Sequence, residues 1–110
     1  MRLFHNPRCS KSRQALALLN DSNKTFEIIH YLVEGIQRED LKRVFHFLSD
    51  DYHSLIRAKE AAAYGYSNQD SLDDVFNLIL EHPSLLQRPL LLSSSFAIVA
   101  RPPELIHSCL

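Results

Sequence analysis

Cys9 is the residue of this chain best placed to do chemistry. It stands between a short strand-forming run, Leu3 and Phe4, and a predicted helix that begins near Ser10. A cysteine at a helix start faces unsatisfied backbone N–H groups and the positive end of the helix dipole, and both stabilise a thiolate. Nearby cations would stabilise it further. The cationic residues that flank Cys9 are Arg8, Lys11 and Arg13. The sequence therefore predicts a nucleophilic thiolate, the alternative being a buried or idle cysteine.

No second cysteine lies close enough in sequence to resolve an adduct on Cys9. The third residue after it is Ser12, so the chain lacks the Cys-x-x-Cys pair that closes its own disulfide. The resolving thiol must therefore come from glutathione, a partner protein or Cys109. Cys109 is the penultimate residue, and chain ends are often mobile. A redox role and an unreactive tail thiol both remain open for it.

His5 lies four residues before Cys9, at the end of the predicted first strand. If the turn at Asn6 and Pro7 brings its ring back, the imidazole could help to activate the thiol. The alternative is a polar residue at a strand end that bonds only to backbone.

Three arginines each interrupt an apolar stretch, and such a residue needs an anion or solvent beside it. Three converging guanidiniums would hold a tetrahedral oxyanion through paired hydrogen bonds. The spacing alone does not show convergence, and each could equally lay its stem along the surface. These arginines are Arg57, Arg88 and Arg101. Pro89 follows the second of them and precedes a predicted strand, which is a suitable place for a cis peptide bond.

The order of predicted elements is β-α-β, a helical block, then β-β-α. We expect a helix over 10–20, a strand over 25–30, a loop over 32–37, helices over 41–48, 55–63 and 72–80, a hairpin of 90–92 with 96–100, and a closing helix whose first turn holds Pro102 and Pro103. Strands at both ends with helices between them predict an α/β fold with a mixed sheet. With 110 residues and no linker, we expect one domain over 1–110, with a helical insertion over roughly 38–84.

Composition excludes several classes of protein. The formal net charge is −1, so no overall field attracts nucleic acid or anionic lipid. No run approaches the roughly 18 apolar residues that a membrane helix needs. No apolar run follows Arg2, so we expect no secretory signal and a cytoplasmic protein with reduced thiols. The six histidines show no metal-ligand spacing, and two isolated glycines cannot form a phosphate-binding loop.

Four segments together resemble the glutaredoxin-coupled arsenate reductases. The first is the stretch 5–13, His-Asn-Pro-Arg-Cys-Ser-Lys-Ser-Arg, which is similar to the nucleophile segment of that family. The other three follow in the family's order and extend the resemblance over essentially the whole chain. They are Leu55-Ile56-Arg57 with Glu60, His82-Pro83 followed by Arg88-Pro89, and Arg101-Pro102.

The resemblance implies a thioredoxin-like fold, with a mixed four-stranded sheet and a helical insertion. It also implies that Cys9 attacks arsenate, that His5 helps, and that the three arginines hold the oxyanion. Ser12, Arg13 and Pro89 are supporting residues, the last as a cis-proline that faces the cysteine. Glutathione is the implied co-substrate and glutaredoxin the protein that reduces the mixed disulfide. We expect a monomer with no bound cofactor and no metal.

Two other functions remain open. One is a glutathione-dependent thiol reductase that keeps Cys9 but acts on another substrate. The other is a non-catalytic, redox-responsive transcriptional regulator that binds RNA polymerase. Such regulators often switch through Cys-x-x-Cys, and Ser12 stands where the second cysteine would be.

Overall fold

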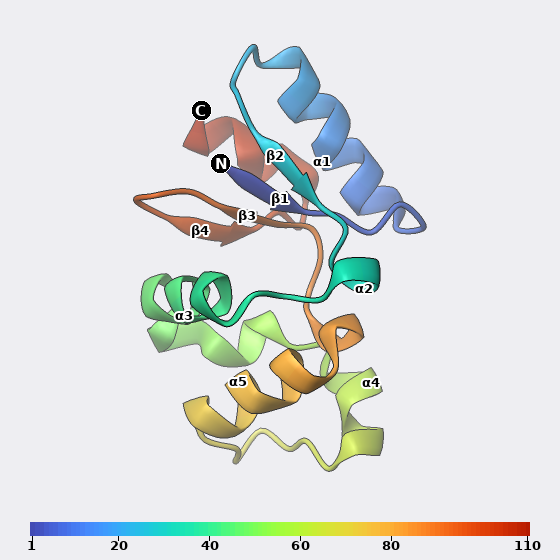
Figure 1. Ribbon diagram of the computed structural model, residues 1–110, viewed down its shortest axis with the longest axis vertical. Helices are drawn as coiled ribbons and strands as arrows, with labels where there is room; N and C mark the ends of the chain where they lie inside the picture. Colours follow the sequence, from blue (N-terminus) through green and yellow to red (C-terminus); the bar gives the residue numbers. More distant parts are fainter.

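The computed structural model describes residues 1–110 and contains one four-stranded mixed sheet in the order β2-β1-β3-β4 (Figure 1). The strands are β1 (Arg2–Phe4), β2 (Glu27–Ile29), β3 (Leu90–Leu92) and β4 (Ala97–Val99). β1 runs parallel to β2 and antiparallel to β3, and β3 runs antiparallel to β4. The predicted fold class, a thioredoxin-like mixed sheet of β-α-β and β-β-α halves, is confirmed.

Helices make up most of the remaining chain. They are α1 (Ser10–Asp21), α2 (Tyr31–Glu34), α3 (Arg38–Phe47), α4 (Ala58–Ala61) and α5 (Leu72–Glu81), with the 3-10 helices η1 (Ser49–Leu55), η2 (Ala62–Tyr64), η3 (Pro83–Leu85) and η4 (Pro103–Cys109). Figure 1 shows α1 and the C-terminal helix beside the sheet at one end of the molecule, and α3, α4 and α5 at the other. No helix is both long and apolar enough to cross a bilayer.

The sheet is buried on both faces, and alternation along β1 shows how. Leu3 belongs to a buried cluster with Ala15 of α1 and Ile106 of η4. Phe4, the next residue, belongs to the larger cluster formed with the helical block. β3 lies in the middle of the sheet and all three of its leucines are buried. A central strand covered on both faces needs this continuous apolar run.

The predicted loop over 32–37 is wrong in its first part, because α2 lies there. Its single turn is closed by hydrogen bonds from the N–H groups of Val33 and Glu34 to the His30 carbonyl. Gly35 ends it with φ +79°, a conformation that favours glycine. A helix of four residues is too short to produce a periodic pattern.

The predicted helix over 55–63 is interrupted in the structure. η1 ends at Leu55, Ile56 is extended and forms an isolated bridge with Leu86, and α4 begins only at Ala58. Two backbone hydrogen bonds flank the bridge, from Gln87 N–H to Leu55 O (2.8 Å) and from Arg57 N–H to Leu85 O (2.8 Å). Pairing with a segment about 30 residues away therefore overrides local helix propensity here.

The closing helix also differs from the expectation. It is a 3-10 helix that begins at Pro103, so Pro102 precedes the helix instead of lying in its first turn. Pro102 has an extended backbone, with φ −71° and ψ 158°.

Two arginine contacts tie α3 to the sheet. Arg2 of β1 donates through Nη1 to both carboxylate oxygens of Asp40, at 2.7 and 2.6 Å. Arg43 Nη2 donates to the Ser93 carbonyl in the β3–β4 turn, at 2.6 Å. The Asp40 side chain is only 7% exposed, so its charge depends on this partner. The contacts hold the helical block against the strands.

Asp40→Ala is expected to lower the free energy of unfolding by about 1–3 kcal/mol, because the Arg2 guanidinium loses its two shortest hydrogen bonds and keeps only the contact of 3.4 Å with Glu27. Arg2 is 37% exposed, and water therefore limits the loss. The matched control is Glu39→Ala, which removes another carboxylate of the same first turn; its partner Lys42 is exposed, so about 0.5 kcal/mol or less is expected. Urea unfolding measures both. Equal losses in the two variants would contradict this role of Asp40.

Candidate active site

All four strands end or begin at one edge of the sheet, and the site lies just beyond that edge. The register aligns Phe4 with Ile29 on one side and with Leu90 on the other, and Leu90 with Val99. Because of the strand directions, this row holds the carboxyl ends of β1, β2 and β4 and the amino end of β3. Segments that are far apart in sequence therefore leave the sheet side by side.

Cys9 is the residue immediately before α1, and its extended backbone (φ −95°, ψ 120°) directs the chain into the helix. Its N–H donates to the Asn6 carbonyl at 3.0 Å, which closes the turn after β1. The backbone N–H groups of Lys11 and Ser12 donate to the sulfur. The Nη1 of Arg101 lies 4.0 Å from Sγ. Cys9 thus lies at the start of a helix, as predicted.

The pKa of the Cys9 thiol is lower than its ordinary value. Burial alone would raise this pKa, since it disfavours the charged form. The hydrogen bond from Ser12 N–H, the charge of Arg88, and the further donors Lys11 N–H and Arg101 together outweigh burial. A thiol of this kind carries more thiolate at neutral pH than an ordinary cysteine does.

The cations that stabilise the thiolate are not the ones that flank it in sequence. The side chains of Arg8 and Arg13 are exposed and are absent from the groups that lower the pKa of Cys9. Arg13 instead donates to the Pro7 carbonyl at 2.9 Å, and Arg8 N–H donates to the Asn6 side chain at 3.0 Å. The expectation that these side chains stabilise the thiolate was wrong, because proximity in sequence does not set the direction of a side chain. Arg13 supports the loop with its side chain, and Arg8 supports it only through its backbone N–H.

His5 contacts Ser12. The two buried side chains are joined by a hydrogen bond of 2.6 Å between Nδ1 and Oγ, and the same Oγ accepts from Asn6 N–H at 3.0 Å. Burial lowers the pKa of His5, and the charges of His30 and Arg13 lower it further. The ring is therefore neutral at neutral pH. It contacts Ser12, whose backbone N–H lowers the pKa of Cys9, and no hydrogen bond joins the ring to the sulfur itself.

Arg88 and Arg101 meet beside Cys9 from the two strands of the hairpin. Arg101 Nη1 donates to the Arg88 carbonyl at 2.9 Å, and Ala100 N–H donates to the Pro89 carbonyl at 2.9 Å. The Arg88–Pro89 peptide bond is cis, as the family resemblance implied. The Arg101–Pro102 bond is also cis, which was not predicted.

Arg57 reaches the same region from the helical block, through the bridge between Ile56 and Leu86. Its guanidinium donates to the Ser84 carbonyl at 3.3 Å and lies 3.5 Å from the Glu60 carboxylate. It is not among the groups that shift the pKa of Cys9. Of the three predicted arginines, Arg101 contacts the sulfur, Arg88 lowers the pKa of the thiol through its charge, and Arg57 does neither.

Two buried donors have no acceptor. The Nε atoms of Arg57 and Arg88 are both buried, and neither makes a hydrogen bond. A buried charged donor without an acceptor is unfavourable, and such groups are rare in native proteins. Both belong to side chains that sequence analysis selected as oxyanion ligands. Both donors are free to form a hydrogen bond with an acceptor from outside the chain.

Tyr31 is a residue of this region that sequence analysis missed. It is the first residue of α2, directly after β2, and it is 1% exposed. Burial raises its pKa to about 12, and it lies close enough to Arg88, Arg57 and Cys9 for each of them to shift this pKa. Its place after the second strand was the available signal, since parallel β1 and β2 end at the same edge.

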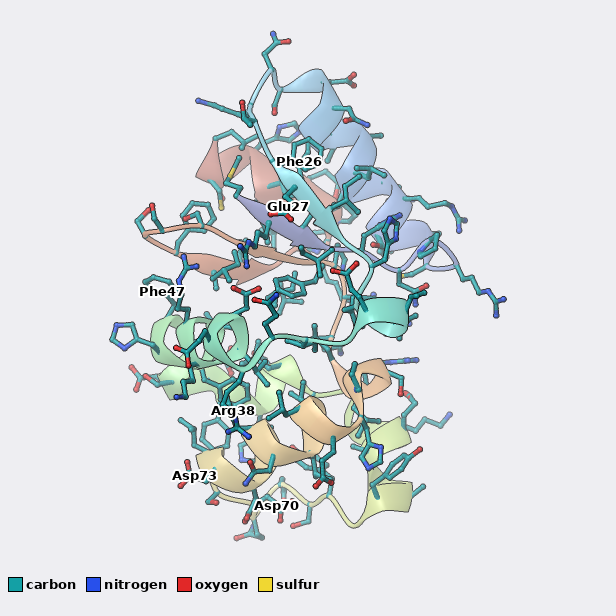
Figure 2. All side chains as sticks on the ribbon, viewed as in Figure 1. Phe26, Glu27, Arg38, Phe47, Asp70 and Asp73 are labelled. Carbon is teal, nitrogen blue, oxygen red and sulfur yellow. The ribbon has the colours of Figure 1, made fainter.

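Cys109, Asp70, Asp73 and Arg38 lie away from the candidate site. Cys109 is the last residue of η4, and Figure 1 shows that chain end far from the loop that precedes α1. Asp70 and Asp73 lie at the end of the helical block remote from the sheet, and Arg38 lies between α3 and α5, 5.9 Å from the Phe76 ring centre (Figure 2). No group of three or more His, Cys, Asp or Glu side chains could hold a metal ion.

Fold and site together define a thioredoxin-like protein with a single activated cysteine at a helix start, faced by arginines from the β3–β4 hairpin. The chain belongs to the ArsC family, whose model matches residues 4–109. It is 36% identical to the arsenate reductase of Neisseria meningitidis serogroup A over 100% of this chain and 97% of that protein. It is 35% identical to the arsenate reductase of Haemophilus influenzae, over 94% and 93% of the two chains. The solved structure of an arsenate reductase from Vibrio cholerae is similar with a TM-score of 0.84, at 34% identity over 100% and 98%.

Arg88→Ala is expected to raise the pKa of Cys9, because the thiolate loses a nearby cation. Arg8→Ala, the matched control, removes a cation next to Cys9 in sequence and should leave this pKa unchanged. The rate of alkylation by iodoacetamide as a function of pH measures it, in a Cys109→Ser background with one thiol. At neutral pH we expect severalfold slower alkylation of Arg88→Ala. A matching loss in Arg8→Ala would show that the flanking charges matter after all.

Proposed function

We propose that this protein reduces arsenate to arsenite in the cytoplasm, with Cys9 as a monothiol nucleophile and with glutathione and glutaredoxin as reductants. The observation that carries the proposal is a cysteine of lowered pKa beside Arg88, whose buried Nε lacks an acceptor. A nucleophile next to an unfilled anion site suits attack on an oxyanion. Membership of the ArsC family, with relatives named arsenate reductase, supports arsenate as that oxyanion.

In the first step, arsenate binds with its oxygens toward the guanidiniums, and the Cys9 thiolate attacks arsenic(V). A sulfur–arsenic bond forms, and one hydroxyl group leaves as water after taking up a proton. Arg88 and Arg101 are the cations nearest the sulfur, so they offset the negative charge that gathers as two anions meet. Arg57 contributes its guanidinium from the side of the helical block.

In the second step, a glutathione thiolate attacks the Cys9 sulfur of the adduct. A disulfide forms, the sulfur–arsenic bond breaks, and its electron pair stays on arsenic. Arsenic(III) therefore leaves as arsenite, and the two thiolates have been oxidised by two electrons. Ser12 stands where a resolving cysteine would be, which is why an external thiol is required.

In the third step, a glutaredoxin thiolate attacks the glutathione sulfur of the mixed disulfide. A new disulfide forms on the glutaredoxin side, and Cys9 leaves as a thiolate. A low pKa makes Cys9 a good leaving group as well as a competent nucleophile. The same donors therefore serve the first and the last step.

The remaining residues position the nucleophile. His5 forms a hydrogen bond with the Ser12 side chain, and Arg13, in the first turn of α1, donates to the Pro7 carbonyl. Pro89 shapes the segment that presents Arg88. All electrons come from thiols, so the reaction as proposed needs no bound cofactor or metal, and a monomer contains every group it uses.

Arsenate-dependent oxidation of NADPH, coupled through glutathione, glutaredoxin and glutathione reductase, tests the proposal. Wild type and Cys109→Ser should turn over, whereas Cys9→Ser should fall to background because the nucleophile is gone. Turnover retained in Cys9→Ser would refute the mechanism.

The same assay separates the competing functions. Cys9-dependent turnover of a small disulfide such as hydroxyethyl disulfide, with none for arsenate, would indicate a thiol reductase of other substrate. A folded wild type inactive with both, but able to retain RNA polymerase from lysate, would indicate a regulator.

A further inference from the structure

Tyr31 occupies the same position relative to the sheet as two of the predicted oxyanion ligands. The aligned row at the sheet edge contains Ile29, Leu90 and Val99. Tyr31 stands two residues beyond the row on β2, as Arg88 does on β3 and Arg101 on β4. Since hydrogen bonds hold these strands in register, all three residues lie at the same distance in sequence beyond the same end of the sheet.

The Tyr31 ring is fixed, but its hydroxyl is unused. The ring belongs to the large buried cluster, together with Phe4, Ile56 and Leu86. The hydroxyls of Tyr52 and Tyr66 are engaged, with the Asp70 carbonyl at 2.8 Å and with His53 at 2.6 Å. No group of the chain forms a hydrogen bond that shifts the titration of the Tyr31 hydroxyl, whose neighbours are two guanidiniums and a thiol. A phenylalanine would make the same ring contacts, so packing of the ring does not explain why the residue carries a hydroxyl.

We propose that the Tyr31 hydroxyl is a further substrate-binding group, which donates a hydrogen bond to an oxygen of the tetrahedral oxyanion held beside Cys9. For arsenate this rests on the function proposed above. Guanidiniums donate hydrogen bonds and cannot accept one, and the Nε atoms of Arg57 and Arg88 already lack acceptors. An anion among them would accept from these donors and from the Tyr31 hydroxyl.

A neutral donor gives this site a hydrogen bond without an additional positive charge, which another arginine could not do. The site already holds several cations, and one more would add repulsion and draw in any anion. A fixed O–H adds a directed hydrogen bond to one oxygen without adding charge. Its pKa of about 12 keeps it protonated throughout the physiological range, so it donates at every pH at which the enzyme works.

The test measures oxyanion binding without turnover. Arsenate or sulfate, added without glutathione, should protect Cys9 from iodoacetamide in a Cys109→Ser background. Tyr31→Phe removes one hydrogen bond to a charged ligand, so half-protection should need about tenfold to a hundredfold more oxyanion. The matched control is Tyr64→Phe, which removes an exposed hydroxyl and should leave protection unchanged. Without oxyanion, Tyr31→Phe should keep the wild-type pH profile of alkylation.

Three other outcomes would overturn the inference, and a fourth would overturn only the proposed function. Unchanged protection in Tyr31→Phe would mean that the hydroxyl does not bind the anion. If Tyr31→Phe weakens protection but also shifts the pH profile of alkylation, the substitution changes the pKa of Cys9 and not the binding of the anion. If neither anion protects the wild-type protein, no oxyanion binds beside Cys9, and the hydroxyl has no ligand there. Protection by sulfate that depends on Tyr31, without arsenate turnover in the coupled assay, would keep the inference and reject the proposed function.

A second measurement needs no substitution at this position. The chain has four tyrosines and no tryptophan, so its near-ultraviolet absorption reports tyrosine. Arsenate should produce a tyrosine difference spectrum that persists in Tyr64→Phe and has the same half-saturating concentration as protection of Cys9. The absence of such a spectrum, with protection intact, would contradict contact between the oxyanion and Tyr31.

Discussion

A half-buried thiolate loses hydration, and that loss has to be offset by donors and cations that the fold holds in place. The donors are the first N–H groups of α1, and the cations are Arg88 and Arg101. The donors follow β1, whereas one arginine precedes β3 and the other follows β4. They meet because β3 is antiparallel to both β1 and β4, which brings the ends of β1 and β4 and the start of β3 to one edge. The chemistry of Cys9 therefore depends on the mixed topology of the sheet.

Guanidiniums that lie close together repel one another, and hydrogen bonds to backbone carbonyls offset part of this repulsion. Arg101 donates to the Arg88 carbonyl and Arg57 to that of Ser84, so each is restrained by an acceptor outside the thiol. Arg57 also depends on the helical block, which reaches the sheet edge through the bridge to Leu86. The pairing of Arg2 with Asp40 holds that block in place. Stability in a region remote from Cys9 is thus coupled to the geometry of the site.

Features determined by local sequence were predictable. The helix start at Ser10, the place of Cys9 before it and the hairpin of two short apolar runs all follow from neighbouring residues. Long-range pairing could not be predicted in this way, so the break at Ile56, which pairs with Leu86, was missed. The helix at Tyr31 was missed because four residues are too few for a periodic pattern. Arg13 shows the complementary error, because its guanidinium is close to Cys9 in sequence but donates to the Pro7 carbonyl and does not lower the pKa of the thiol. The three arginines were selected because each interrupts an apolar stretch, but spacing alone left their convergence open, and the family resemblance implied their role as oxyanion ligands.

The central claim is that Cys9 alone forms the covalent intermediates of an arsenate-dependent thiol cycle. Intact-mass spectrometry of the Cys109→Ser protein, incubated with arsenate and glutathione but no glutaredoxin and then quenched with acid, tests it most directly. We expect one added glutathione, linked as a disulfide to Cys9 and formed only when arsenate and glutathione are both present. An unmodified protein, or a glutathione adduct that forms equally without arsenate, would contradict it.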